Sequence, residues 1–143
     1  MDESTLPEPI RTALDILRKS HSPDARADAL HDNWVYVWLP SVHMDEEKFP
    51  APHERGLWVR LPLQFPFALP HGIVTKDPLL ATDGHAVKGH NPGHEMCNPV
   101  REIGGAHYYS WTWNGELGQG PTLRSADDIL EVVHWVERRI RLA

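Results

Sequence analysis

Proline limits what the middle of this chain can fold into. Most of its 13 prolines lie between residues 40 and 99. Proline lacks a backbone N–H and clashes with the preceding helical turn, and within sheets it is confined to edges, strand starts and bulges. We therefore expect extended strands and loops over this stretch and helices only towards the two ends. That order of elements is typical of an α+β protein.

Helical periodicity is found in the two terminal regions. Residues 7–20 and 126–141 each place apolar side chains three and four positions apart, which predicts amphipathic helices. Ser125 and Asp128 resemble a capping box at the start of the second helix. Ser22 followed by Pro23 is a further start signal, and it predicts a short helix through about Leu30. The apolar stripes consist of Ile10, Ala13, Leu14 and Leu17, and of Ile129, Val132, Val133, Val136 and Ile140.

Strand patterns occupy the residues between these helices. Residues 33–39 alternate Trp34, Tyr36 and Trp38 with Val35, Val37 and Leu39, the clearest strand pattern in the chain. Further strands are expected at 56–61 and 73–75, and residues 108–113 fit either a strand or a packed loop. Residues 41–54 are expected to form a loop or long hairpin turn, and the prolines of 62–72 an extended edge or crossover segment. Residues 76–107 are expected to form a long loop, and such loops are usually functional.

Composition narrows the class of protein. A length of 143 residues fits one domain spanning residues 1–143, with a core that needs neither metal nor disulfide. A net charge of −6 offers no global basic field for nucleic acid. One cysteine fits a reducing compartment, the acidic N-terminus lacks the pattern of a signal peptide, and no apolar run approaches the roughly 18 residues of a membrane span. We expect a cytoplasmic domain that contacts neither nucleic acid nor membrane.

Cys97 is the only cysteine, and its surroundings are polar. Histidines 85, 90 and 94 precede it in a stretch rich in Gly and Pro. A thiolate is the reactive form of cysteine, and a nearby protonated histidine or loop amides would lower the thiol pKa. This pattern predicts an exposed, reactive thiol.

Three chemistries fit these residues. In the first, Cys97 is a nucleophile that carries an acyl group, His90 or His94 assists it, and Asn91 or loop N–H groups stabilise the oxyanion. In the second, His85, His90, His94 and Cys97 bind zinc, although their spacing matches no standard finger. In the third, Cys97 is structural and the histidines are solvated. No protease signature surrounds the thiol.

Several short segments resemble the compact bacterial ubiquitin-conjugating enzymes. Residues 57–70, Leu-Trp-Val-Arg-Leu-Pro-Leu-Gln-Phe-Pro-Phe-Ala-Leu-Pro, are similar to the strand and proline-rich turn of that family. His90-Asn91-Pro92 resembles its His-Pro-Asn loop with the last two residues exchanged, and Cys97 follows at the nucleophile's place. Trp111 or Trp113 resembles the next tryptophan, and residues 121–135 resemble the entry to the following helix.

The resemblance implies a ubiquitin-conjugating-like fold: an N-terminal helix, an antiparallel strand meander, a long catalytic loop and a C-terminal helix. It implies a transferase that carries a ubiquitin-like protein as a thioester on Cys97, assisted by His90, Asn91 and His94, without cofactor or metal. The implied partners are a ubiquitin-like protein, an activating enzyme that meets the N-terminal helix, and a protein acceptor or ligase. Two alternatives remain: a non-catalytic binding module of the same fold that uses residues 66–72 and the tryptophans, and the zinc-binding protein.

Overall fold

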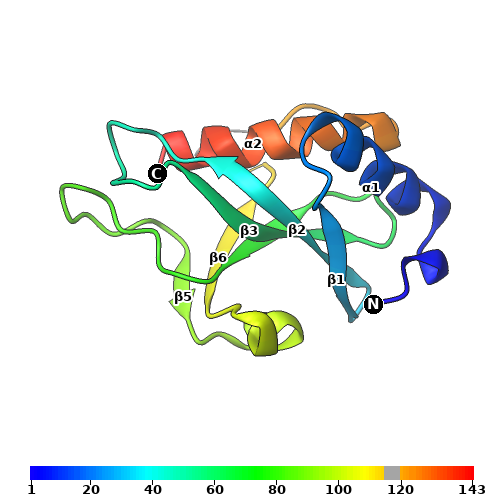
Figure 1. Ribbon diagram of the computed structural model, residues 1–143, viewed down its shortest axis with the longest axis horizontal. Coiled ribbons are helices and arrows are strands. Elements are labelled where there is room, and N and C mark those ends of the chain that lie inside the picture. Colours follow the sequence, from blue (N-terminus) through cyan, green and yellow to red (C-terminus); the bar gives the residue numbers. More distant parts are fainter. Residues whose placement is uncertain (115–119) are drawn as a thin grey trace.

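The computed structural model describes residues 1–114 and 120–143, which form an α+β fold around one antiparallel sheet. Its six strands lie in the order β1-β2-β3-β4-β6-β5. Helices α1 (Glu8–Ser20) and α2 (Ile129–Arg141) lie on one face, and the 3₁₀ helix η2 (Glu95–Ile103) lies on the other (Figure 1). The strands are β1 (Arg26–His31), β2 (Trp34–His43), β3 (Glu54–Pro62), β4 (His71–Thr75), β5 (His90–Pro92) and β6 (His107–Thr112).

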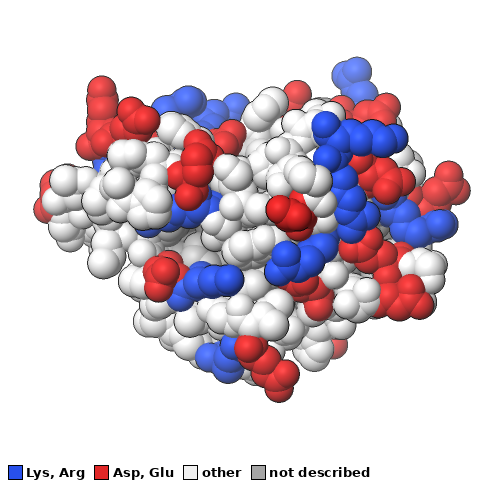
Figure 2. All heavy atoms as spheres, in the orientation of Figure 1, with Lys and Arg blue, Asp and Glu red and all other residues white. Residues whose placement is uncertain are grey.

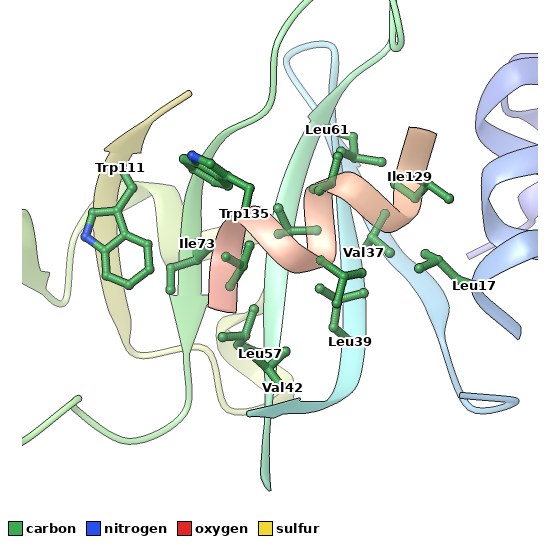
Figure 3. Close-up of a cluster of buried hydrophobic side chains, with 14 of the residues drawn as sticks. Leu17, Val37, Leu39, Val42, Leu57, Leu61, Ile73, Trp111, Ile129 and Trp135 are labelled. Atoms are coloured by element: carbon green, nitrogen blue, oxygen red, sulfur yellow. The ribbon is translucent and has the colours of Figure 1, made fainter. Parts of the chain in front are cut away.

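The larger core lies between the sheet and the two long helices. The helices predicted for the two terminal regions, 7–20 and 126–141, are confirmed, and the apolar stripe of each is buried. Figure 3 shows α2, with Ile129 and Trp135, in front of the strands that contribute Val37, Leu57, Leu61 and Ile73, and Leu17 of α1 at the side. Burying apolar surface is worth roughly 25 cal/mol per Å², so this layer supplies most of the driving force for the fold. The two short 3₁₀ helices η1 (Glu3–Thr5) and η3 (Ala126–Asp128) precede α1 and α2, and the predicted capping box of Ser125 and Asp128 is present at η3.

The opposite face of the sheet carries a smaller, aromatic core. The alternation expected in residues 33–39 is confirmed: Val35, Val37 and Leu39 face the long helices, whereas Tyr36 faces η2. Tyr36 is paired with Arg60, and Trp38 with Trp58, across the β2–β3 ladder. Directly opposite residues of neighbouring strands share a face, so the side chains of Arg60 and Trp58 of β3 lie on this face as well. The buried members of this second core are Tyr36, Trp58, Val74, Cys97, Val100 and Tyr108.

The helix predicted for residues 22–30 is wrong, because residues 26–31 form the edge strand β1. This strand pairs antiparallel with β2 through a two-residue hairpin at Asp32 and Asn33, whose φ angles are +49° and +67°. Asn and Asp tolerate this left-handed conformation better than most residues, and turns of this hand match the twist of a hairpin. Pairing with β2 therefore outweighs the local start signal of Ser22 and Pro23.

The long loop predicted for residues 76–107 is only partly present. It contains the short strand β5, which pairs with β6, and the nine-residue helix η2. Residues 62–72 were expected to form an extended edge or crossover segment, but residues 63–68 form turns and bends that join two neighbouring antiparallel strands, since β3 ends at Pro62 and β4 begins at His71. Residues 107–112 form a strand between β4 and β5. Of the helices in the described residues, none combines the length and the apolar character needed to cross a membrane.

Candidate functional site

Cys97 lies in η2 and is fully buried, with 0% of its surface exposed. Its sulfur belongs to the second core, beside side chains such as Tyr36 and Tyr108. The expectation of an exposed thiol is therefore wrong. Residues three apart lie on one side of a 3₁₀ helix, so η2 turns Cys97 and Val100 inwards together and leaves its polar residues to solvent.

The thiol is also less acidic than the sequence predicted. Burial raises the pKa of Cys97, and the nearby positive charge of Arg101 opposes this rise only in part. An apolar environment disfavours the charged form of a thiol. The resting structure therefore holds a protonated thiol at neutral pH, which is the form of cysteine that reacts slowly.

His94 caps the start of η2. Its Nδ1 atom accepts a hydrogen bond of 3.1 Å from the backbone N–H of Met96, and its ring stacks on Tyr108 with centroids 5.1 Å apart. An accepting Nδ1 requires the neutral ring with the proton on Nε2. In this arrangement the ring stabilises the helix start, and its role as a general base remains a prediction.

His90 and Asn91 lie in β5, at the edge of the sheet. His90 Nε2 is 2.9 Å from His107 Nδ1, and its ring stacks on Tyr109. Burial lowers the pKa of His90, and the neighbouring His107 lowers it further. The Asn91 side-chain amide donates to the backbone oxygen of Gly89, 2.9 Å away. Within the described chain, no hydrogen bond connects any of these side chains to the Cys97 sulfur.

The four residues considered for zinc have separate partners. The side chain of His85 is hydrogen-bonded to Asp83 and to the backbone oxygen of Ala143, whereas that of His90 is hydrogen-bonded to His107 in the β5–β6 pair. Nowhere in residues 1–114 and 120–143 do three or more His, Cys, Asp or Glu side chains gather in a way that could hold a metal ion.

Residues 63–70, between β3 and β4, form an apolar projection whose base is fixed. Phe65 is 1% exposed and belongs to the larger core, and the flanking prolines 66 and 70 are buried. Phe67, by contrast, is 84% exposed, and Leu69 is 39% exposed. We call Phe67 and the residues around it the Phe67 surface. It includes a hollow of about 410 Å³ lined by Glu8, Pro9, Thr12, Pro66, Phe67, Arg124, Ser125 and Ala126.

A buried arginine on the second face was not singled out from the sequence. Arg60 is 3% exposed, and Trp34 lies over its guanidinium at 4.4 Å. The alternation Trp58–Arg60 in residues 57–61 does contain the signal, because it places a charge on the side of the strand that faces the aromatic residues of β2. A charged residue at such an inward position is rare unless it is paired.

Searches against protein-family models, curated protein sequences and solved structures found no significant match to this chain. Its class is therefore defined by its own architecture: an α+β protein with an N-terminal helix, a six-stranded antiparallel sheet and a C-terminal helix.

Proposed function

We propose that this chain is a non-catalytic protein-binding module with a ubiquitin-conjugating-like fold, and that it holds its partner on the Phe67 surface. The observation that carries the proposal is the side chain of Phe67, which is 84% exposed on a segment whose neighbours are anchored in the core. The order of elements, with a proline-rich connection between β3 and β4, supports the fold assignment.

The projection has the properties of a binding hot spot. An exposed aromatic ring buries a large apolar area on association, and prolines on both sides reduce the entropy lost when the segment is fixed by a partner. Glu8 and Arg124 line the hollow beside the ring and place one charge of each sign there. The partner is therefore a protein that offers an apolar recess for Phe67, rimmed by polar groups of both signs.

The activating enzyme is the first partner to test. The Phe67 surface includes Glu8, Pro9 and Thr12 of α1, and the resemblance to ubiquitin-conjugating enzymes implies that the N-terminal helix meets the activating enzyme. A module that binds this enzyme without accepting the ubiquitin-like protein would act as an adaptor or competitor in conjugation.

The alternative proposal is the carrier function, which requires a structural change that the binding module does not need. A thioester on Cys97 requires the sulfur to become exposed, and hence η2 to move away from the sheet. The burial of the thiol and its raised pKa favour the non-catalytic proposal. The ubiquitin-like protein and the acceptor or ligase belong to this alternative.

Binding should be measured by calorimetry with a purified activating enzyme for ubiquitin-like proteins. We expect Phe67→Ala to weaken binding by about 30-fold or more, which corresponds to a hot spot of about 2 kcal/mol. Leu80→Ala is the matched control, since Leu80 is 64% exposed but lies outside the Phe67 surface. Equal affinities of the two variants would contradict the proposed surface.

Intact-mass analysis separates the two functions. The protein would be incubated with the activating enzyme, the ubiquitin-like protein and ATP, with and without a thiol reductant. The binding module predicts no adduct and unchanged binding by Cys97→Ala. A reductant-sensitive adduct that disappears in Cys97→Ala would overturn the non-catalytic proposal and establish the carrier.

A further inference from the structure

Arg60 is a buried cation on the aromatic face of the sheet. It is 3% exposed and surrounded by rings, with its guanidinium carbon 4.4 Å from the centroid of Trp34, 5.7 Å from that of Tyr36 and 5.6 Å from that of Tyr108. Aromatic faces attract a cation but do not neutralise it. A charge removed from water in this way is costly unless an anion accompanies it.

No anion accompanies Arg60 within the described residues. Its Nη1 donates to the backbone oxygen of His71 at 3.1 Å and to the Tyr108 hydroxyl at 3.3 Å, and both of these acceptors are neutral. Its Nε atom is buried and has no hydrogen-bond partner. Every Asp or Glu oxygen of the described chain lies beyond ion-pair distance from this guanidinium, whereas Arg18 and Arg26 both have such partners. The guanidinium of Arg60 therefore has an unsatisfied hydrogen-bond donor and no counter-charge within the described residues.

The side chain lines a hollow of about 210 Å³ that opens between β2, β3 and η2. Trp34, Tyr36 and Met96 supply its aromatic and apolar walls, and Asn98 adds a polar group. His31, Asp32 and Glu95 complete the lining, and all three are exposed. The Tyr36 hydroxyl donates to the backbone oxygen of Met96 at 2.8 Å, which holds η2 against the sheet at this point.

We propose that this hollow is a binding site for a small zwitterion of the α-amino acid class, with its carboxylate on Arg60. A guanidinium presents a planar set of donors that matches a carboxylate, and an incoming carboxylate supplies the charge that Arg60 lacks. The volume admits a ligand of amino-acid size and excludes a large one.

The two acidic residues that line the hollow, Asp32 and Glu95, favour a ligand that carries a positive group as well as its carboxylate. Asp32 and Glu95 repel a dianion such as a phosphate and attract a positive group. Asp32 already pairs with His31 at 3.2 Å, whereas the side chain of Glu95 makes no ion pair or hydrogen bond within the described chain. An α-ammonium group beside the carboxylate would therefore lie towards Glu95, and the apolar walls of Trp34 and Met96 would receive a side chain.

The test uses the full chain and four probes in calorimetric titrations: L-leucine, N-acetyl-L-leucine, L-leucinamide and inorganic phosphate. We expect L-leucine to bind and each of the other three to bind at least about tenfold more weakly, since each lacks one of the two charges or carries an excess of negative charge. Equal binding of L-leucine and L-leucinamide would overturn the role of Arg60, and equal binding of N-acetyl-L-leucine would overturn the zwitterion. No binding of L-leucine at millimolar concentration would overturn the site for this class.

Three variants test the site, and two of them change exposed residues only, which keeps the test independent of folding. Arg60→Lys should abolish binding, but it alters a buried position. Glu95→Gln changes only an exposed group. It should weaken the binding of L-leucine and strengthen the binding of N-acetyl-L-leucine. Glu102→Gln, on η2 but outside the hollow, is the matched control and should change neither. If Glu95→Gln instead lowers the midpoint of thermal unfolding substantially, Glu95 is the internal partner of Arg60 and the ligand site is overturned.

This inference does not depend on the Phe67 surface. The hollow lies beside η2 on one face of the sheet, whereas Phe67 lies beside α1, which covers the other. Loss of partner binding in Phe67→Ala together with unchanged L-leucine binding would confirm that the two sites are separate.

Discussion

At the scale of single residues, the surroundings of Cys97 in the sequence and in space differ. Its neighbours along the chain are mostly polar, whereas its neighbours in space are Tyr36, Trp58, Val74 and Tyr108. Its chemistry follows the spatial neighbours, because desolvation acts on the sulfur itself and raises its pKa. A lone cysteine among histidines is therefore insufficient evidence of a reactive thiol.

We predict that Cys97 reacts slowly with a thiol reagent in the native protein and rapidly in urea. The rate with 5,5′-dithiobis(2-nitrobenzoate) should rise by orders of magnitude on unfolding, because both burial and the raised pKa are then lost. Rapid native reaction at neutral pH would show that η2 opens readily and would revive the carrier function.

Cys97→Ala should also lower stability. Removal of a fully buried sulfur leaves a small cavity in the second core, and we expect a loss of about 1–2 kcal/mol in the free energy of unfolding. Urea denaturation of the two proteins measures this difference. An unchanged midpoint would indicate that the sulfur contributes little to packing.

At the scale of elements, the periodicity of apolar residues is sufficient to predict the helices and strands that pack against a single core. Both long helices and the strands β2, β3 and β4 are found where the apolar spacing predicts them, because a helix or strand on a single core repeats one pattern along its length. The strand β1 was missed because Ser22 and Pro23 are a start signal in isolation. The signal that identifies this hairpin, Asp32-Asn33, becomes decisive only once β2 is available as a partner.

The start of β4 depends on a glycine. Gly72 has a φ of +78°, and a Cβ atom there would lie 2.6 Å from the Tyr108 ring. We predict that Gly72→Ala lowers the free energy of unfolding by about 2–5 kcal/mol, the sum of roughly 1–2 kcal/mol for the left-handed backbone and a further 1–3 kcal/mol for overpacking. Urea denaturation provides the measurement.

Gly84→Ala is the matched control for that prediction. Gly84 has a φ of +82°, but a Cβ atom there would meet no atom within 4 Å. It should therefore cost only the backbone contribution, about 1–2 kcal/mol. If the two substitutions cost the same, contact with Tyr108 does not constrain this turn.

At the scale of the whole molecule, charge is distributed without a dominant patch on the face shown in Figure 2, where basic and acidic side chains are interspersed. Two positively charged side chains are instead buried in the interior of the molecule. Arg60 is buried at one core, and Arg139, which is 7% exposed, lies 4.5 Å from the Trp111 ring centroid at the other. A strand pattern can predict that such a residue points inwards, but the hollow beside Arg60 exists only once β2, β3 and η2 meet.

Three partly desolvated histidines make the fold sensitive to mild acid. Burial lowers the pKa of His21, His71 and His90; Glu137 and Glu54 oppose the effect at His21, whereas Arg60 reinforces it at His71. Below the ordinary histidine pKa of about 6.5, the unfolded chain binds protons that these folded side chains do not. The free energy of unfolding should therefore fall as the pH is lowered from 7.5 to 5.5.

His43 has the opposite sign and serves as the control. Its hydrogen bond to Glu54, 3.0 Å from Nδ1, raises its pKa, so the folded state binds a proton more readily than the unfolded chain. The contribution of His43 to the free energy of unfolding is present below the pKa that it has in the unfolded chain. This contribution is lost as the pH rises through the pKa that it has in the folded state. Urea denaturation at both pH values should show a steeper loss of stability in His43→Gln than in the unaltered protein, and a shallower one in His21→Leu. The carboxyl groups whose pKa is lowered, such as Glu3, act at lower pH and do not enter this window. Parallel losses in all three proteins would show that histidine burial does not set the acid response.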